Sequence, residues 1–323
     1  MDKAVRLRSP GGIERLEVID WPAQVPGPNE IRVRHHAIGV NFIDIYHRTG
    51  LYPLPTPAIP GIEGAGIVEA LGDNVAGVSV GQRVAYAGLP GAYAATRLLP
   101  AWRAIPLPAT ISSRLAAASV LRGMTAHMFL TRTYPVLPGT VLLIHAAAGG
   151  LGVVLTRWAK SLGATVIGAV GSQEKAETAR ANGADLVIVG RDVDLIAEVA
   201  RLTEGRGVNF AIDGIGGGTL AKTLGCVRRF GTVASIGQAA GPIPPVAVEE
   251  IGPVRSLCLA RPSVMAYAAD KDIYATAMTA VLAMIEAGIA AEVGGNYRLE
   301  AAAEAQADLE AGRTIGSAVL QPR

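Results

Sequence analysis

Hydrophobic and polar positions divide the chain into two parts with different periods. Within residues 1–110, short runs such as Leu16–Ile19 and Glu30–Val40 alternate apolar and polar side chains, as half-buried strands do. A short helix is expected at 41–48, before an irregular proline-rich loop at 52–57. Because the short strands are separated by glycine turns, they predict a small, barrel-like β-rich domain.

From Ser112 onward, apolar runs of strand length alternate with stretches of helical period. This alternation predicts an α/β fold, a doubly wound parallel sheet with helices on both faces. The chain then ends in a mixture of strands and helices. The expected strands are 141–144, 165–169, 186–189, 208–213, 231–237, 256–260, 293–299 and 317–320, and the expected helices include 116–121, 125–132, 194–203, 220–227, 272–287 and 301–311.

The most informative stretch follows the apolar run Val141–Ile144. Ala147–Gly152 has the G-x-G-x-x-G pattern of dinucleotide-binding proteins, with alanine in the first glycine position. Apolar residues at helical spacing from Val154 to Leu162 then predict a helix that Gly163 ends. The glycines let a pyrophosphate approach the backbone, and the helix N-terminus offers it N–H groups. The pattern predicts a nucleotide site, with a plain structural turn as the alternative.

The turn after the next strand indicates which nucleotide is bound. In NAD-preferring sites an acidic residue bonds the ribose 2′-hydroxyl here, but Val170–Lys175 has no acid at the strand end. Ser172, Lys175 and, after the following strand, Arg191 are suited to hold a 2′-phosphate by hydrogen bonds and charge. The sequence therefore predicts NADPH. The alternative is a solvated turn in which Ser172 only caps a helix.

Composition argues against several other classes of protein. The 323 residues suffice for two domains, and half of them are apolar. The net charge is only +2 and no run of like charges occurs, so we expect no nucleic-acid partner. Without a long uncharged apolar run or an apolar leader, we expect no membrane partner and a cytoplasmic location. Cys226 and Cys258 stand among apolar residues, so both are expected to be buried thiols.

Several stretches together carry a family resemblance: NFIDIYHRTGLYP, GIEGAGIVEALG, HAAAGGLG and GAVGSQEKA. With them, nearly the whole chain resembles the quinone oxidoreductase (zeta-crystallin-like) branch of the zinc-independent medium-chain dehydrogenase/reductases. The resemblance implies a GroES-like catalytic domain interrupted by a Rossmann domain and completed by the C-terminus. The corresponding ranges are 1–115, 116–262 and 263–323. It also implies a homodimer.

The resemblance makes two positions informative about metal. Asn41 stands where alcohol dehydrogenases of the wider superfamily have a zinc-ligating cysteine, and Ile62 stands where they have the histidine. Zinc needs three or four N, S or O ligands at short range. The nearby His35, His36 and His47 have a spacing typical of packing or solvent-exposed histidines. We therefore expect no metal.

The function implied by the resemblance is NADPH-dependent reduction of a quinone held in the cleft between the domains. Without zinc to polarise a carbonyl, the substrate should be easy to reduce, so an activated enone also fits. One alternative is an enone or enoyl-thioester reductase of the same superfamily. Another is an NADPH-binding structural or RNA-binding protein.

The resemblance also assigns site residues. Asn41, Tyr46 and Tyr52 are the expected substrate-cleft residues. The alternative roles are structural: Tyr46 would belong to the core of its domain, and Tyr52 would anchor its loop. Asp44 either contacts cofactor or braces Asn41, and Thr125 either lies beside the nicotinamide or starts a helix. The expected cofactor contacts are Asn41, Asp44, Thr125, Ala148, Gly149, Gly150, Leu151, Gly171, Ser172, Lys175, Arg191, Ile236, Gly237, Gln238, Leu259, Ala260 and Arg261.

Two arginines, Arg261 and Arg191, have roles that depend on their neighbours in the fold. Arg261 is expected either as a charged partner of the cofactor or as a tie between the domains. Where relatives have a tyrosine on the adenine side, this chain has Gly190, so Arg191 is expected to carry more of the cofactor contact.

Overall fold

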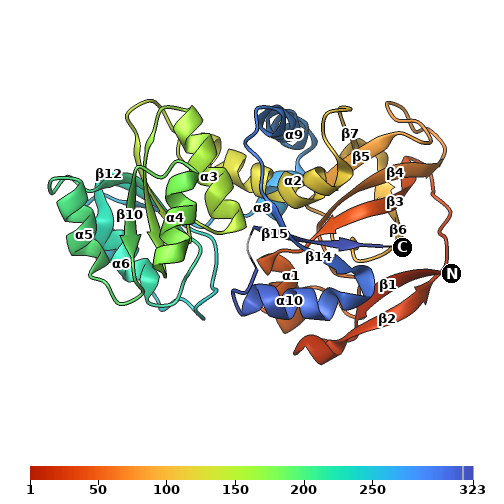
Figure 1. Cartoon of the computed structure of the whole chain (residues 1–323), viewed down its shortest axis with the longest axis horizontal. Coiled ribbons are helices and arrows are strands. Elements are labelled where there is room, and N and C mark those ends of the chain that lie inside the picture. The colour runs from red at the N-terminus through yellow and green to blue at the C-terminus, as the bar shows by residue number, and fades with distance from the viewer. Residues whose placement is uncertain (315, 323) are drawn as a thin grey trace. The chain divides into compact units, whose positions relative to one another are not determined.

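The computed structural model describes residues 1–314 and 316–322, and its chain forms two compact units (Figure 1). The first unit combines Met1–Met124 with Met265–Arg323, and the second is Thr125–Val264. Each unit has its own sheet and its own hydrophobic core. No helix in the described part of the chain is long and apolar enough to cross a membrane.

The first unit is built on a seven-stranded, mainly antiparallel sheet. Its strands follow the order β14-β15-β3-β4-β5-β7, and β6 pairs with β3 beside this path. Side chains such as Val33, Tyr86, Tyr93 and Leu320 fill its core and are fully buried. The strands are β3 Glu30–Gly39, β4 Glu63–Leu71, β5 Arg83–Ala87, β6 Thr96–Pro100, β7 Ile105–Pro106, β14 Val293–Arg298 and β15 Ser317–Gln321, with β1 Asp2–Leu7 and β2 Leu16–Trp21 as a separate pair.

Helices of this unit pack on and around the sheet. One of them, α2 (Ser113–His127), is continuous, so the prediction of separate helices at 116–121 and 125–132 is wrong. Gly123 does not interrupt it, because a Cβ at this position would lie 2.7 Å from Val281 Cγ1, and the missing side chain lets another helix pack closely. The other helices are α1 Phe42–Thr49, α8 Val264–Ala269, α9 Lys271–Glu286 and α10 Ala302–Glu310, with 3₁₀ turns η1 Ile13–Arg15, η2 Ala101–Arg103 and η4 Leu299–Ala301.

The second unit is a doubly wound α/β domain. Its six strands are all parallel and follow the order β10-β9-β8-β11-β12-β13, which is the Rossmann order 3-2-1-4-5-6. The predicted combination of a Rossmann sheet with a β-rich domain is thereby confirmed. The elements are η3 Met128–Thr133 (a π-helix), β8 Val141–His145, α3 Gly150–Ser161, β9 Thr165–Val170, α4 Gln173–Ala181, β10 Leu186–Val189, α5 Leu195–Leu202, β11 Val208–Asp213, α6 Thr219–Cys226, β12 Val227–Ser235, α7 Val248–Ile251 and β13 Cys258–Ala260.

The two cysteines differ in their surroundings. Cys226 at the end of α6 is buried, as expected, but Cys258 is exposed. The prediction for Cys258 is wrong. Its strand, β13, is the last in the order of its sheet, so a neighbouring strand lies on one side of it only, although its sequence is apolar.

Candidate functional site

The glycine turn after β8 has the geometry of a nucleotide-binding loop. Ala146 adopts a left-handed backbone with φ 50°, and Gly149 is the N-cap of α3. A Cβ on Gly152 would lie 2.3 Å from the Ala146 carbonyl oxygen, so only glycine allows this close approach of helix and turn. The predicted contacts Ala148, Gly149, Gly150 and Leu151 lie in this turn and the first turn of α3. Backbone N–H groups at such a helix start favour an anion.

The turn after β9 gathers hydroxyl and basic groups. Ser172 caps α4, since its Oγ accepts a 3.4 Å hydrogen bond from the Lys175 backbone N–H. The Arg191 side chain lies over Gly171, where its Nε is 3.4 Å from the place a Cβ would occupy. Ser172, Lys175 and Arg191 are all exposed. The structure thus brings these three residues to one turn. Ser172 has the capping role that was its alternative, and its contact with a 2′-phosphate stays a prediction.

Gly190 precedes Arg191 with a φ of 123°, a backbone conformation that side chains with a Cβ rarely adopt. A tyrosine at this position would be strained with this backbone.

Two loops follow β11 and β12 at the same carboxyl edge of the sheet. A Cβ on Gly237 would be 2.3 Å from the Gly214 carbonyl oxygen, so the loops touch through backbone. Arg261, just after β13, donates a 2.8 Å hydrogen bond from Nη1 to Ser235 Oγ in its own unit. The remaining predicted contacts here are Ile236 and Gln238 in the loop after β12, and Leu259 and Ala260 on β13, paired with Val233 and Ala234.

A buried polar cluster, which sequence reasoning missed, lies at this edge. Thr223 Oγ1 is 2.9 Å from His145 Nε2 and 3.4 Å from Asp213 Oδ2. Asp213 Oδ1 also accepts from the N–H groups of Ile215 and Gly216, at 2.8 and 3.1 Å. Burial lowers the pKa of His145, which favours the neutral imidazole. A polar residue at the end of each apolar strand was the available signal.

In the first unit, Asn41 is the N-cap of α1 and is held by two acidic residues. Its Nδ2 donates to Glu63 Oε1 at 2.7 Å, and its backbone N–H donates to Asp44 Oδ2 at 2.9 Å. Asp44 is fully buried, and Oδ2 also accepts from the Tyr93 hydroxyl at 3.0 Å. The bracing role weighed for Asp44 is therefore present, and its cofactor contact stays a prediction.

Glu63 and Arg122 complete this buried network and were not foreseen. Glu63 Oε2 accepts from the Leu121 N–H at 2.8 Å, and Oε1 lies 3.4 Å from Arg122 Nη1. Burial raises the pKa of Glu63, and it raises the pKa of Asp44 to about 7. An acid at the start of the glycine-rich strand β4 was the sequence signal for Glu63.

Two predicted tyrosines contact each other, and Tyr46 is buried, as its domain-core alternative expects, whereas Tyr52 is half-buried. Tyr46 on α1 and Tyr52 in the following loop make an edge-to-face ring contact with centroids 5.1 Å apart. The Tyr52 N–H also donates to the Tyr46 carbonyl at 3.0 Å. Thr125 lies inside α2 and not at a helix start, so that alternative role for Thr125 is wrong.

Two of the three histidines considered as metal ligands have separate partners, whereas Nδ1 of His47 is buried without a hydrogen-bond partner. His35 is buried between the Ala94 carbonyl and the Tyr86 hydroxyl, at 2.7 and 2.8 Å, and burial lowers its pKa to about 3. His36 Nδ1 is 3.2 Å from Ser113 Oγ. Within residues 1–314 and 316–322, no group of three or more His, Cys, Asp or Glu side chains is placed to hold a metal ion.

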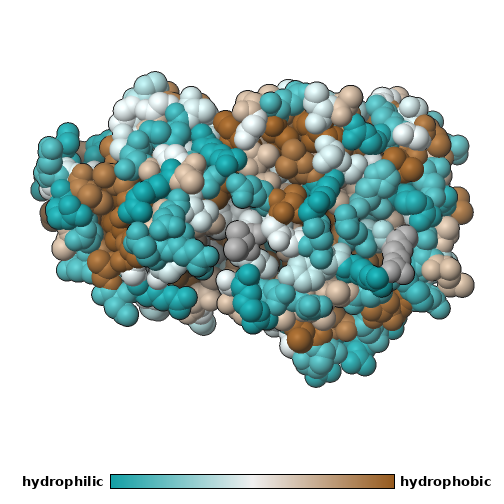
Figure 2. Space-filling model, in the orientation of Figure 1, coloured by the Kyte–Doolittle hydropathy of each residue, from teal (hydrophilic) through white to brown (hydrophobic). Residues whose placement is uncertain are grey.

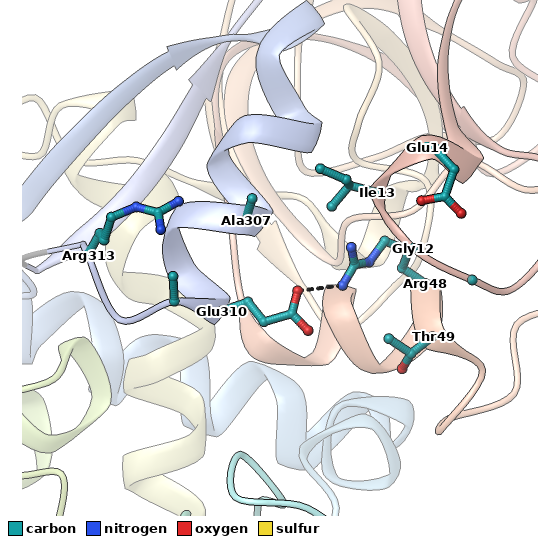
Figure 3. Close-up of a pocket in the computed structure, with 10 residues that line it drawn as sticks. Gly12, Ile13, Glu14, Arg48, Thr49, Ala307, Glu310 and Arg313 are labelled. Carbon is teal, nitrogen blue, oxygen red and sulfur yellow. Dashed lines mark hydrogen bonds and ion pairs between the residues drawn. The ribbon is translucent and has the colours of Figure 1, made fainter.

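A separate hollow of about 690 Å³ lies where α1, α10 and η1 meet (Figure 3). Arg48, 2% exposed, crosses it to form a 2.8 Å ion pair with Glu310. Arg313, at its rim, is paired with Asp308 at 2.7 Å. None of the predicted site residues lines this hollow. Its two arginines are held in ion pairs within the protein.

A β-rich unit joined to a Rossmann unit with a phosphate-type turn defines the class of protein: a medium-chain type dehydrogenase/reductase. Comparison with known families agrees. Residues 27–109 match the family described as alcohol dehydrogenase GroES-like domain, and residues 150–283 match the one described as zinc-binding dehydrogenase.

Individual relatives narrow this class. The chain is 40% identical to a quinone oxidoreductase of Pseudomonas aeruginosa, over 100% of both chains. It is also 40% identical to a 2-haloacrylate reductase of a Burkholderia species, again over 100% of both. A crystal structure of Escherichia coli quinone oxidoreductase complexed with NADPH superposes with a TM-score of 0.94 and 37% identity, over 99% of this chain and 100% of the other. The chain belongs to the quinone oxidoreductase family, and the predicted family and oxidoreductase class are confirmed.

Proposed function

We propose that this protein reduces quinones with NADPH and without zinc. The observation that carries the proposal is the turn after β9, where Ser172, Lys175 and Arg191 gather with no acidic residue at the strand end. This arrangement suits a 2′-phosphate by charge-assisted hydrogen bonding. Full-length relatives that are quinone oxidoreductases support the choice of substrate.

The residues of the second unit fit the cofactor. The glycine turn leaves room for a pyrophosphate at the start of α3, since Gly152 lets the helix approach the turn at Ala146. Ser172, Lys175 and Arg191 would hold the 2′-phosphate. The loop at Ile236–Gln238, with Leu259–Arg261, would contact the nicotinamide half mainly through backbone. Bound NADPH supplies the hydride, and the protein supplies position and a dry pocket.

The residues of the first unit would orient the substrate. Glu63 uses one amide proton of Asn41 and fixes the amide in one orientation, so we assign the other proton to a ligand oxygen. The rings of Tyr46 and Tyr52 offer an aromatic wall to a planar quinone. Asp44 acts through Asn41 as a positioning residue, because its carboxylate bonds the backbone of the helix cap.

Zinc does not fit the residues present. Asn41 is committed to Glu63 and Asp44, and Ile62 is a fully buried apolar side chain. Neither position supplies the thiolate or imidazole that catalytic zinc prefers. We therefore assign no step to a metal.

An activated enone is the second candidate substrate. It is favoured by the 2-haloacrylate reductase, which this chain matches over its whole length. An enoyl thioester on a phosphate-bearing carrier is less favoured, because residues 52–60 contain no basic side chain. By the same family relation we propose a homodimer, which light scattering of the purified protein would test, and a cytoplasmic location, which cell fractionation would test.

The deciding experiment is NADPH oxidation with ortho-quinones, para-quinones, 2-haloacrylate, simple enones and enoyl thioesters, each at matched concentration. Turnover should be highest with a quinone and unchanged after chelator treatment. Activity with 2-haloacrylate or enones and none with any quinone would select the second candidate. NADH supporting turnover as well as NADPH would refute the role of the β9 turn.

A further inference from the structure

A pocket of about 690 Å³ lies in the second unit, at the amino ends of the strands. It is formed by residues just before β11, at the end of α6, at the start of β12 and just before β13, with one wall from α5. The glycine turn and the turn after β9 lie at the carboxyl ends of the same parallel strands. The pocket therefore belongs to the opposite edge of the sheet and is separate from the proposed NADPH site.

The charged groups of this pocket are all of one sign. Arg206, Arg228, Arg229 and Arg255 line it, and among the lining residues, all of them in the described part of the chain, none is acidic. Four guanidinium groups in one pocket contrast with a net charge of only +2 for the whole chain. Of the four, only Arg206 makes a recorded ion pair, a 3.2 Å contact with the exposed Glu204. The pocket therefore presents a local positive field.

Two of these arginines are fixed in place by backbone carbonyls. Arg255 donates from Nη2 to the carbonyls of Leu224 and Val227, at 2.7 and 2.8 Å. Arg228 donates from Nη1 to the Arg229 carbonyl at 3.1 Å, while its Nε is buried and has no hydrogen-bond partner. A buried donor without a partner costs free energy, and a ligand oxyanion would supply the missing acceptor.

Apolar side chains stand beside the arginines. Phe230 and Val254 are each 72% exposed, and Ile196 on α5 is 43% exposed. Figure 2 shows hydrophobic surface over the part of the unit where Figure 1 places α5 and α6. Phe230 has a left-handed φ of 61°, which is a strained conformation for a bulky residue and turns the start of β12.

We propose that this pocket is a second binding site, for a small amphiphilic anion that carries a carboxylate or phosphate group on an apolar body. The oxyanion would be bound by Arg228 and Arg229, and the apolar body would contact Phe230 and Val254. Cys226, which also lines the pocket, takes no covalent part, because burial raises its pKa to about 12 and keeps the thiol protonated.

The test measures binding of phenyl phosphate and of benzoate by calorimetry, with inorganic phosphate and benzyl alcohol as partial probes. The protein is saturated with NADPH, so that the probes cannot enter the cofactor site. We expect phenyl phosphate or benzoate to bind, and whichever binds more tightly identifies the oxyanion. Amide resonances of residues 205–207 and 225–230 should shift on binding. The partial probes should bind at least tenfold more weakly.

Variants locate the site. Arg228→Gln and Arg229→Gln should each weaken binding about tenfold, because each removes a charge-assisted hydrogen bond. Phe230→Gly removes the aromatic contact, and glycine adopts the left-handed backbone at this position without strain. The affinity of this variant for phenyl phosphate should fall to the affinity of the wild type for inorganic phosphate. The control is Arg201→Gln, an exposed arginine on α5 that is paired with Glu198 and does not line the pocket. It should bind as the wild type does.

Several outcomes would overturn the proposal. Equal binding by wild type, Arg228→Gln and Arg229→Gln would do so, as would inorganic phosphate binding as tightly as phenyl phosphate. Light scattering that shows a dimer in the wild type and a monomer in Phe230→Glu would assign this surface to a second copy of the chain instead. If Arg228→Gln fails to fold, the binding measured with Arg229→Gln tests the proposal, because Arg229 is exposed and its replacement should leave the fold intact.

Discussion

The side-chain amide of Asn41 donates a 2.7 Å hydrogen bond to Oε1 of Glu63, a carboxylate fully buried beneath it. Arg122, 3.4 Å from the same oxygen, is the only cation in the recorded ion pairs of Glu63 within the described residues. A neutral amide at position 41 is therefore required by its surroundings. The amide supplies a hydrogen-bond donor to the buried carboxylate of Glu63 and adds no charge of its own.

Asn41→Asp should destabilise the protein by about 3 kcal/mol at pH 7, because it places a third buried carboxyl beside those of Glu63 and Asp44. The free energy of unfolding in urea measures this effect. Asn74→Asp is the control, since Asn74 is exposed and aspartate tolerates its left-handed backbone. An equal, small change in both variants would contradict the buried network.

Asp44 makes stability depend on pH. Burial raises its pKa from 3.8 to about 7, so between these values the folded protein holds a proton that the unfolded chain has lost. Its contribution is fully present below pH 3.8 and is lost as pH rises through 7. The unfolding free energy of wild type minus that of Asp44→Asn should fall across this range, by a total on the order of 4 kcal/mol. A flat difference from pH 4 to 8 would remove the basis for a protonated Asp44.

Lys175 and Arg191 should discriminate between the two nicotinamide cofactors. Lys175→Ala and Arg191→Ala should each raise the Kd for NADPH roughly tenfold, the loss of one charge-assisted contact, and leave the Kd for NADH nearly unchanged. Fluorescence titration measures both constants. Arg180→Ala, an exposed arginine on the same helix as Lys175, is the matched control. A parallel loss for NADPH and NADH would place these side chains away from the 2′-phosphate.

Gly152 should not tolerate a side chain. Gly152→Ala places a Cβ 2.3 Å from a backbone oxygen, which cannot rotate away, so we expect a loss of about 2 kcal/mol in stability and weaker binding of both cofactors. Gly218→Ala is the control, because no atom lies within 4 Å of its Cβ position and its backbone is right-handed. Thermal unfolding with and without NADPH separates the two variants, and equal effects would argue against a tight turn at Gly152.

Local patterns in the sequence determined the elements and the nucleotide loop. Strand and helix periods depend on residues close together in the chain, and the alternation after Ser112 corresponds to the six parallel strands of the Rossmann unit. The G-x-G-x-x-G pattern is likewise local, because its glycines serve one turn. The prediction of separate helices at 116–121 and 125–132 failed, because Gly123 between them serves the close approach of Val281, from a helix more than a hundred residues away in the chain.

Only the tertiary structure decided the polar contacts that position the site. Glu63 meets Asn41 and Arg122 because β4, α1 and α2 pack together, and Thr223 meets His145 and Asp213 because β8 and β11 are neighbours. The arginine pocket likewise joins residues from 196 to 255. Such contacts depend on which strands and helices become neighbours, and the period of a single strand or helix carries no information about its partner.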